Sequence, residues 1–157
     1  MIIFDIPGSR SITIKNVIFD FNGTLGEGGT LIESVGDKIK ELAGKNVNIY
    51  IVTADTYGTV KKQCMDLPVE VRIFNKEDSS KDKKSMIEKL GCDVTASVGN
   101  GRNDLEMFKN SVISICVIGK EGCFTKSLLE SDIAVTNILD AIDLLLNNDR
   151  IRATLRT

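Results

Sequence analysis

The hydrophobic residues of this chain fall into short runs of β type, separated by segments with helical spacing. A buried strand is predicted over residues 15–20, because β-branched and aromatic residues lead up to Asp20 and an Asn-Gly turn follows at once. Further apolar runs predict strands at residues 47–52, 69–74, 94–98, 112–118 and 133–135. Periodic segments predict helices at residues 31–42, 57–65, 82–90, 105–109, 125–130 and 138–146, with a basic turn or helix at 149–155.

This alternation of strands and helices predicts an α/β fold: a doubly wound, mainly parallel sheet with helices on both faces. Two apolar runs, 1–6 and 11–14, flank a Pro-Gly turn and predict a β-hairpin before the first core strand. The Gly-rich segment 25–31 predicts a mobile turn or flap over the end of that strand. The chain has 157 residues and no repeat or linker, so we expect one domain over 1–157.

Composition excludes several classes of function. The net charge is −2 and charges of both signs are interspersed, which argues against nucleic-acid binding. No apolar run approaches the roughly 20 residues that span a membrane, and no signal peptide precedes the first strand, so we expect a cytoplasmic protein with no membrane partner. The chain has no His, which excludes Ser-His and Cys-His catalysis. Its four cysteines form no Cys-x-x-Cys pair and are expected to be reduced thiols.

Four residues whose side chains can take part in catalysis or binding follow predicted strands or begin helices: Asp20, Thr53, Lys83 and Asp104. In a doubly wound sheet such positions converge on one edge. A carboxylate there can attack phosphorus, while Thr and Lys donors hold the phosphoryl oxygens. Mg²⁺ would reduce the repulsion between the anionic nucleophile and an anionic substrate.

Each of these features has an ordinary structural explanation when taken alone. An Asn-Gly pair is a common turn, Thr53 suits a helix cap, and Lys81, Lys83 and Lys84 could form a solvated helix face. Their order along the chain, each at a strand end or a helix start, favours a site for phosphate and Mg²⁺.

The motifs resemble those of the haloacid dehalogenase (HAD) superfamily of phosphatases and phosphotransferases. Residues 20–25 look like its first motif, Thr53 its second, Lys83 its third and residues 99–104 its fourth. The runs 53–58 and 152–156 are similar to those of small soluble proteins that resemble the phosphorylation domain of P-type ATPases.

The resemblance implies a role for each matching residue. Asp20 would be the nucleophile and a Mg²⁺ ligand, together with the backbone carbonyl of Asn22 and with Asp104. Phosphate would be bound around Asp20 by the first two motifs and the lysine, at Asn22, Gly23, Thr53, Ala54 and Lys83. Lys81 and Lys84 are rivals to Lys83, which is preferred because its spacing to the apolar helix face matches the family.

Two positions depart from the family pattern. Asn22 stands where most phosphatases of the superfamily have an Asp that relays protons. An amide cannot relay a proton, so we expect turnover to be slower, by a factor of about 10²–10⁴, than with Asp at this position. Asn100 stands where the fourth motif has Asp, so it would be a neutral metal ligand and leave Asp20 and Asp104 as the anionic ones.

The spacing leaves no room for the cap domain of many superfamily members, since only about 30 residues separate Asp20 from Thr53. We therefore expect an open site, which accepts a macromolecular phosphate or is closed by a neighbouring subunit; a homo-oligomer through the N-terminal hairpin is one arrangement. Three hypotheses follow: a Mg²⁺-dependent phosphohydrolase or phosphotransferase, a weakly active or inactive protein that binds phosphate or a partner, and a phospho-acceptor domain of the response-regulator kind. The third fits worst, because such domains carry a paired acidic cluster after the first strand.

Overall fold

The structure, a computed structural model, describes residues 1–55, 58–74 and 78–157. Within these ranges the central sheet has six strands, all parallel, in the spatial order β10-β9-β8-β3-β6-β7. Their bounds are β3 (Asn16–Asp20), β6 (Asn48–Thr53), β7 (Glu70–Ile73), β8 (Thr95–Gly99), β9 (Ile113–Val117) and β10 (Ile133–Val135). The predicted doubly wound α/β fold is confirmed.

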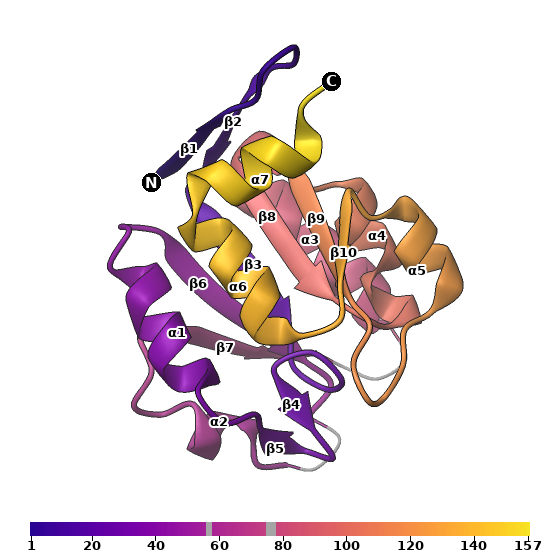
Figure 1. Ribbon diagram of the computed structural model, residues 1–157. Helices are drawn as coiled ribbons and strands as arrows, with labels where there is room; N and C mark the ends of the chain where they lie inside the picture. Colours follow the sequence, from indigo (N-terminus) through magenta and orange to yellow (C-terminus); the bar gives the residue numbers. More distant parts are fainter. Residues whose placement is uncertain (56–57, 75–77) are drawn as a thin grey trace.

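Helices cover both faces of the sheet, as Figure 1 shows with α1 and α6 in front and α3 and α4 behind. The helices are α1 (Val35–Ala43), α2 (Val60–Gln63), α3 (Ser79–Leu90), α4 (Leu105–Lys109), α5 (Thr125–Glu130), α6 (Ile138–Leu146) and α7 (Asn148–Leu155). Two short 3₁₀ turns, η1 (Cys92–Val94) and η2 (Arg102–Asp104), precede β8 and α4. Every residue of β3, β8 and β9 is buried, as expected for strands that helices cover on both sides.

The side chains of β3 divide between two apolar clusters because successive residues of a strand point to opposite faces. Val17 and Phe19 pack with the larger cluster, under α1 and α6. Ile18 packs with Ile87 of α3 in the smaller cluster on the other face. Asp20 follows the same alternation as Ile18, so its carboxylate is directed to the face that α3 covers.

The N-terminal hairpin forms as predicted, from β1 (Ile2–Asp5) and β2 (Ser11–Ile14). It lies beside α7, so that both chain termini come to one end of the molecule (Figure 1). The Gly-rich segment forms a second, smaller hairpin, β4 (Gly26–Glu27) and β5 (Thr30–Leu31). No helix in the described ranges is both long and apolar enough to cross a membrane.

The helix predicted from residue 31 begins four residues later, at Val35, and that boundary was wrong. Leu31 pairs with Gly26 in the β4–β5 hairpin, and Ser34 has a left-handed backbone with φ of 67°, so a helix cannot pass through it. The predicted helix 57–65 is limited to α2; its first predicted residue lies outside the described residues.

Candidate functional site

Three neighbouring parallel strands deliver the candidate residues to one edge of the sheet. Asp20 is the last residue of β3 and lies opposite Val52 of β6, so Thr53, the last residue of β6, is one step further along the same edge. Asp20 is 5% exposed and Thr53 1% exposed. The carboxyl ends of parallel strands are where open α/β sheets hold ligands, and here that end is lined by buried polar groups.

A buried lysine joins the two candidate carboxylates. Lys83 Nζ lies 2.7 Å from Oδ1 of Asp20 and 2.6 Å from Oδ1 of Asp104. Lys83 and Asp104 are completely buried. Both contacts are charge-assisted hydrogen bonds, and both are at or just below the short end of the usual range for such bonds.

The sequence of α3 explains why Lys83, among three neighbouring lysines, reaches Asp20. Ser79, Lys83 and Ile87 are its buried residues, and their spacing of four places them in one stripe that faces the sheet. Lys81 and Lys84 lie off this stripe. They form surface ion pairs with Asp78 and Glu88.

Burial and mutual charge shift the pKa values of Asp20 and Lys83. Burial, together with the charge of Asp104, raises the pKa of Asp20 from 3.8 to about 7, although Lys83 acts in the opposite direction. Burial alone would lower the pKa of Lys83, but its two carboxylate partners outweigh that effect and raise it. Lys83 is therefore a fixed positive charge, whereas Asp20 gains or loses a proton near neutral pH.

Asp104 is held rigidly by its own loop. Its Oδ2 accepts hydrogen bonds from the backbone N–H groups of Asn100 (2.9 Å) and Gly101 (2.8 Å). A Cβ on Gly99 would lie 2.5 Å from this carboxylate, so only glycine leaves room for it there. With Oδ1 bound to Lys83, a single lone-pair position of Oδ1 remains for a ligand.

The turn after Asp20 is shaped by Gly23, whose φ is 78°. The Gly23 N–H donates to the carbonyl of Gly26 at 2.9 Å, so it does not point freely toward the site. The side-chain oxygen of Asn22 is buried and has no hydrogen-bond partner in the described part of the chain. A buried amide oxygen without a donor is costly, and it marks a place where a ligand or water would bind.

The second candidate motif forms a tight turn at the end of β6. The Thr53 hydroxyl accepts a hydrogen bond from the N–H of Asp55 at 2.9 Å, which leaves its own proton free to donate. Asp55 has a left-handed backbone with φ of 43°, and its carboxylate accepts from the N–H groups of Thr59 and Val60, where α2 begins. Ala54, between them, is partly exposed at the same edge. The next two residues of the 53–58 run lie outside the described residues.

Asn100, the fourth expected metal ligand, is held at both ends of its side chain. Its Oδ1 accepts from the Thr24 hydroxyl at 3.2 Å, and its Nδ2 donates to the carbonyl of Gly122 at 3.0 Å. Sequence reasoning gave no role to Thr24 or Gly122. Thr24 belongs to the first motif, so its position was a signal that could have been used. Gly122 is 22 residues from Asn100 and carried none.

The donor set suits a magnesium ion. The carboxylate of Asp20, the amide and backbone oxygens of Asn22 and the free position on Asp104 are all oxygen donors, which Mg²⁺ prefers. No group of three or more His, Cys, Asp or Glu side chains that could hold a metal is present in residues 1–55, 58–74 and 78–157. Two carboxylates therefore have to be supplemented by neutral oxygens, water or a phosphate.

No protein-family model matches the chain. Two curated relatives from Methanocaldococcus jannaschii match parts of it. The uncharacterized protein MJ0073 is 53% identical over 60 residues, which is 38% of this chain and 64% of that protein. A soluble P-type ATPase-like phosphatase is 25% identical over 123 residues, 77% of this chain and 45% of that protein. The chain thus spans less than two thirds of the length of both relatives.

Solved structures share the fold over most of the chain. The 3-deoxy-D-manno-octulosonate 8-phosphate phosphatase of Moraxella catarrhalis, in complex with magnesium, phosphate and its sugar, has a TM-score of 0.69 and 20% identity, covering 91% of this chain and 94% of that one. A HAD-superfamily hydrolase of subfamily III A from Legionella pneumophila has a TM-score of 0.72 and 17% identity. The match covers 90% of this chain and 86% of that one. A phosphoserine phosphatase, solved as an analogue of its phospho-aspartyl intermediate, has a TM-score of 0.69 and 16% identity. The match covers 85% of this chain and 99% of that one.

These likenesses show that the chain has the fold of the HAD-superfamily phosphatases. The Moraxella catarrhalis structure holds a magnesium ion, and a structure of the corresponding phosphatase from Haemophilus influenzae holds cobalt.

Proposed function

We propose that this chain is a Mg²⁺-dependent phosphohydrolase or phosphotransferase that works through an aspartyl-phosphate on Asp20. The observation that supports this most is the buried bridge from Lys83 to Asp20 and Asp104, at the ends of adjacent parallel strands. Phosphoryl transfer through a carboxylate needs a nucleophilic carboxylate, a fixed positive charge and a second carboxylate. All three are buried together at this edge of the sheet. Phosphatases among the relatives and structural neighbours support the same reaction class.

The charge balance of the site calls for a cation. When ionised, Asp20 and Asp104 carry two negative charges, and Lys83 compensates one of them, so a net negative charge faces an incoming phosphate. We assign the cation to the Asp20 carboxylate, the backbone carbonyl of Asn22 and Asp104. When bound, Mg²⁺ supplies the positive charge that lets a phosphate dianion approach a carboxylate.

The residues of the chain have defined roles in the two half-reactions. An Asp20 oxygen attacks phosphorus, and the bond from phosphorus to the leaving oxygen breaks. The Thr53 hydroxyl, the Ala54 N–H and the Lys83 ammonium donate to the phosphoryl oxygens. Water then attacks phosphorus, which releases inorganic phosphate and restores the carboxylate; an alcohol in place of water gives phosphoryl transfer.

Asn22 limits the rate of both half-reactions. Its amide can neither protonate the leaving oxygen nor take a proton from the attacking water, so bulk water has to do both. The missing general acid–base group corresponds to about 10²–10⁴ in rate. The phosphorylated enzyme should therefore persist longer than in a phosphatase with Asp at this position.

The second candidate function is a phosphate- or partner-binding protein with negligible turnover. It is favoured by Asn22, whose amide cannot relay a proton, and by Asn100, which replaces a carboxylate of the family's fourth motif. In that case Asp20, Thr53 and Lys83 would bind phosphate without cleaving its ester bond.

The proposed substrate is a phosphate monoester reached from an open edge, in the cytoplasm, where the four free cysteines would stay reduced. Because the site is uncapped, a phosphorylated macromolecule is one substrate class. The N-terminal hairpin, expected as a contact with a second copy, leads directly into the first residue of β3 and so lies at the opposite end of the sheet from Asp20 (Figure 1); a copy docked there would not cover the site. Ile3 of that hairpin is 45% exposed, so the hairpin is proposed as a contact between copies and not as a cover for the site.

Hydrolysis of an aryl phosphate with and without Mg²⁺ tests the proposal, with Asp20→Asn as the control. The proposed enzyme gives slow, Mg²⁺-dependent release of phosphate that Asp20→Asn abolishes. Saturable phosphate binding without any Mg²⁺-dependent turnover would instead support the binding protein. Turnover that survives in Asp20→Asn would contradict an aspartyl-phosphate on this residue.

A further inference from the structure

Asn100 is tied to the chain through its backbone as well as its side chain. Its N–H donates to Asp104, and its carbonyl accepts from the N–H of Phe124 at 2.8 Å. Its side chain joins Thr24 on one side and Gly122 on the other. The residue is 8% exposed, so water competes little for these four bonds.

The orientation of the Asn100 amide is fixed by its partners. The carbonyl of Gly122 can only accept a hydrogen bond, so the NH₂ group of Asn100 must face it, and Oδ1 must face the Thr24 hydroxyl. An Asp at position 100 would place a carboxylate oxygen 3.0 Å from the carbonyl oxygen of Gly122 and lose the donor. The pocket around position 100 is therefore suited to an amide and unsuited to a carboxylate.

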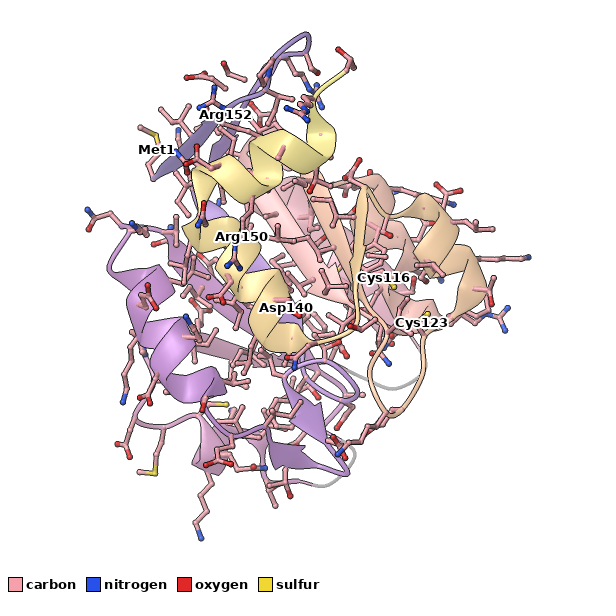
Figure 2. All side chains as sticks on the ribbon, viewed as in Figure 1. Met1, Cys116, Cys123, Asp140, Arg150 and Arg152 are labelled. Atoms are coloured by element: carbon pink, nitrogen blue, oxygen red, sulfur yellow. The ribbon has the colours of Figure 1, made fainter. Side chains whose placement is uncertain are left out.

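The two partners of Asn100 belong to different loops beside the candidate active site. Thr24 lies in the loop that follows Asp20, where a Cβ on Gly23 would come within 2.3 Å of Asn100 Nδ2. Gly122 lies in the loop 118–124 that follows β9, which the label of Cys123 marks in Figure 2. These loops and the β4–β5 hairpin line a cavity of about 230 Å³.

Loop 118–124 also holds the β4–β5 hairpin. Lys120 pairs with Glu27 at 3.0 Å, and Glu121 accepts from the N–H of Gly28 at 2.8 Å. Both contacts are exposed and weak by themselves, whereas the Asn100 bond to Thr24 is buried and its bond to Gly122 is partly buried. Asn100 is thus the most protected link between the turn after Asp20 and the loop that supports the hairpin.

We propose that Asn100 is a positioning residue: its amide clamps the loop after Asp20 to loop 118–124, and it does not serve as a ligand of the cation. The clamp fixes the turn that carries Asn22, and with it one wall of the cavity. The clamp itself is a property of the folded chain; only its consequence for catalysis rests on the proposed function.

Hydrogen exchange without Mg²⁺ tests the clamp directly. Asn100→Asp and the isosteric Thr24→Val each remove one side-chain bond, and both should raise exchange roughly three- to tenfold in peptides covering 21–31 and 118–124. Thr24→Ser keeps the hydroxyl and should stay near wild type. Asn110→Asp is the matched control: Asn110 also donates from its amide to a backbone carbonyl, on α4, away from both loops.

Calorimetric titration with Mg²⁺ separates a clamp from a ligand. A carboxylate at a true ligand position binds Mg²⁺ more tightly, so Asn100→Asp would raise the affinity if Asn100 were a ligand. The clamp predicts no gain in affinity for Asn100→Asp, and for Thr24→Val it predicts a lower kcat at saturating Mg²⁺ in any hydrolysis assay. If no hydrolysis is found at all, the proposed function fails, but the exchange and calorimetry still decide on the clamp.

The outcomes are distinct. Faster exchange in both loops for Asn100→Asp and Thr24→Val, with no tighter Mg²⁺ binding, supports the clamp. Tighter Mg²⁺ binding by Asn100→Asp overturns it, and so does wild-type exchange in Thr24→Val. Because Thr24→Val preserves the shape of the side chain, it tests the proposal even if Asn100→Asp does not fold.

Discussion

Lys83 Nζ lies 2.7 Å from Oδ1 of Asp20, although 63 residues separate them in the sequence and both are buried. The same ammonium contacts Asp104, so the Lys83 side chain holds two carboxylates at the edge of the sheet. Every expected role of Asp20 depends on this contact. It keeps the carboxylate in place and partly offsets the cost of burying its charge.

Replacing Lys83 by Met should destabilise the protein strongly. The substitution leaves two buried carboxylates without a cation, and breaking a buried pair in this way costs about 3–5 kcal/mol of unfolding free energy. Urea denaturation at pH 8 without divalent cations measures the effect. Lys84→Met is the control: its ion pair with Glu88 is on the surface, at 4.0 Å, and its loss should change stability by less than about 0.5 kcal/mol. Equal effects of the two substitutions would contradict the buried bridge.

The stability of the cation-free protein should fall, relative to Asp20→Asn, as pH rises from about 4 to about 7. The pKa of Asp20 is raised from 3.8 to about 7 in the folded state, so the folded protein holds this proton more tightly than the unfolded chain. That stabilisation is present below pH 4 and lost as pH passes the folded pKa; its full size is about 4 kcal/mol. Denaturation of both proteins across pH 4–8 measures it. A wild type that gains stability over Asp20→Asn with rising pH would show that the pKa shift has the opposite sign.

Asn22→Asp should accelerate turnover. It restores a group that can protonate the leaving oxygen and deprotonate the attacking water, so the steady-state rate on an aryl phosphate should rise by about 10²-fold or more. Initial rates at saturating Mg²⁺ give the comparison. The double variant with Asp20→Asn should remain inactive, which excludes hydrolysis started by the new carboxylate alone. An Asn22→Asp protein no faster than wild type would contradict the role assigned to position 22.

The four cysteines should react with a thiol reagent in a fixed order. Cys92 is exposed, whereas burial raises the pKa of Cys64 to about 11, and burial with the nearby thiol of Cys123 raises that of Cys116 to about 12. Figure 2 shows Cys116 inside the fold and Cys123 in the loop beside it. At pH 8, Ellman's reagent should give a fast phase that Cys92→Ser reduces by one thiol, whereas the buried thiols of Cys64 and Cys116 should react only after unfolding. Fast reaction of Cys64 or Cys116 in the folded Cys92→Ser protein would contradict their burial.

Much of the fold follows from local patterns in the sequence. Helices α4, α5 and α6 begin and end at the predicted residues, because each combines helical spacing with a clear boundary. The start of α1 was missed because the hydrophobic spacing continues back through Leu31, while the pairing of Leu31 with Gly26 depends on a separate hairpin. Local periodicity contains no information about that competition.

The candidate site was accessible to sequence reasoning for one physical reason: parallel strands end at a common edge, so residues after several strands can be expected together. Asp20, Thr53 and Asp104 follow this rule. The preference for Lys83 over Lys81 and Lys84 came from its spacing to the apolar face of the predicted helix, and in α3 Lys83 is the lysine that is buried beside Ile87. The clamp of Asn100 could not be predicted, because Gly122 takes part only through its backbone carbonyl, which the residue type does not encode.

Intact-mass measurement after rapid acid quenching shows whether Asp20 carries the phosphoryl group. The protein is incubated with an aryl or acyl phosphate in the presence and absence of Mg²⁺, and the modified residue is located by peptide fragmentation. We expect one phosphoryl group on Asp20 that depends on Mg²⁺, accumulates because Asn22 slows its hydrolysis, and is absent from Asp20→Asn. Phosphate release without any modification of Asp20, or a phosphoryl group on another residue, would contradict this expectation.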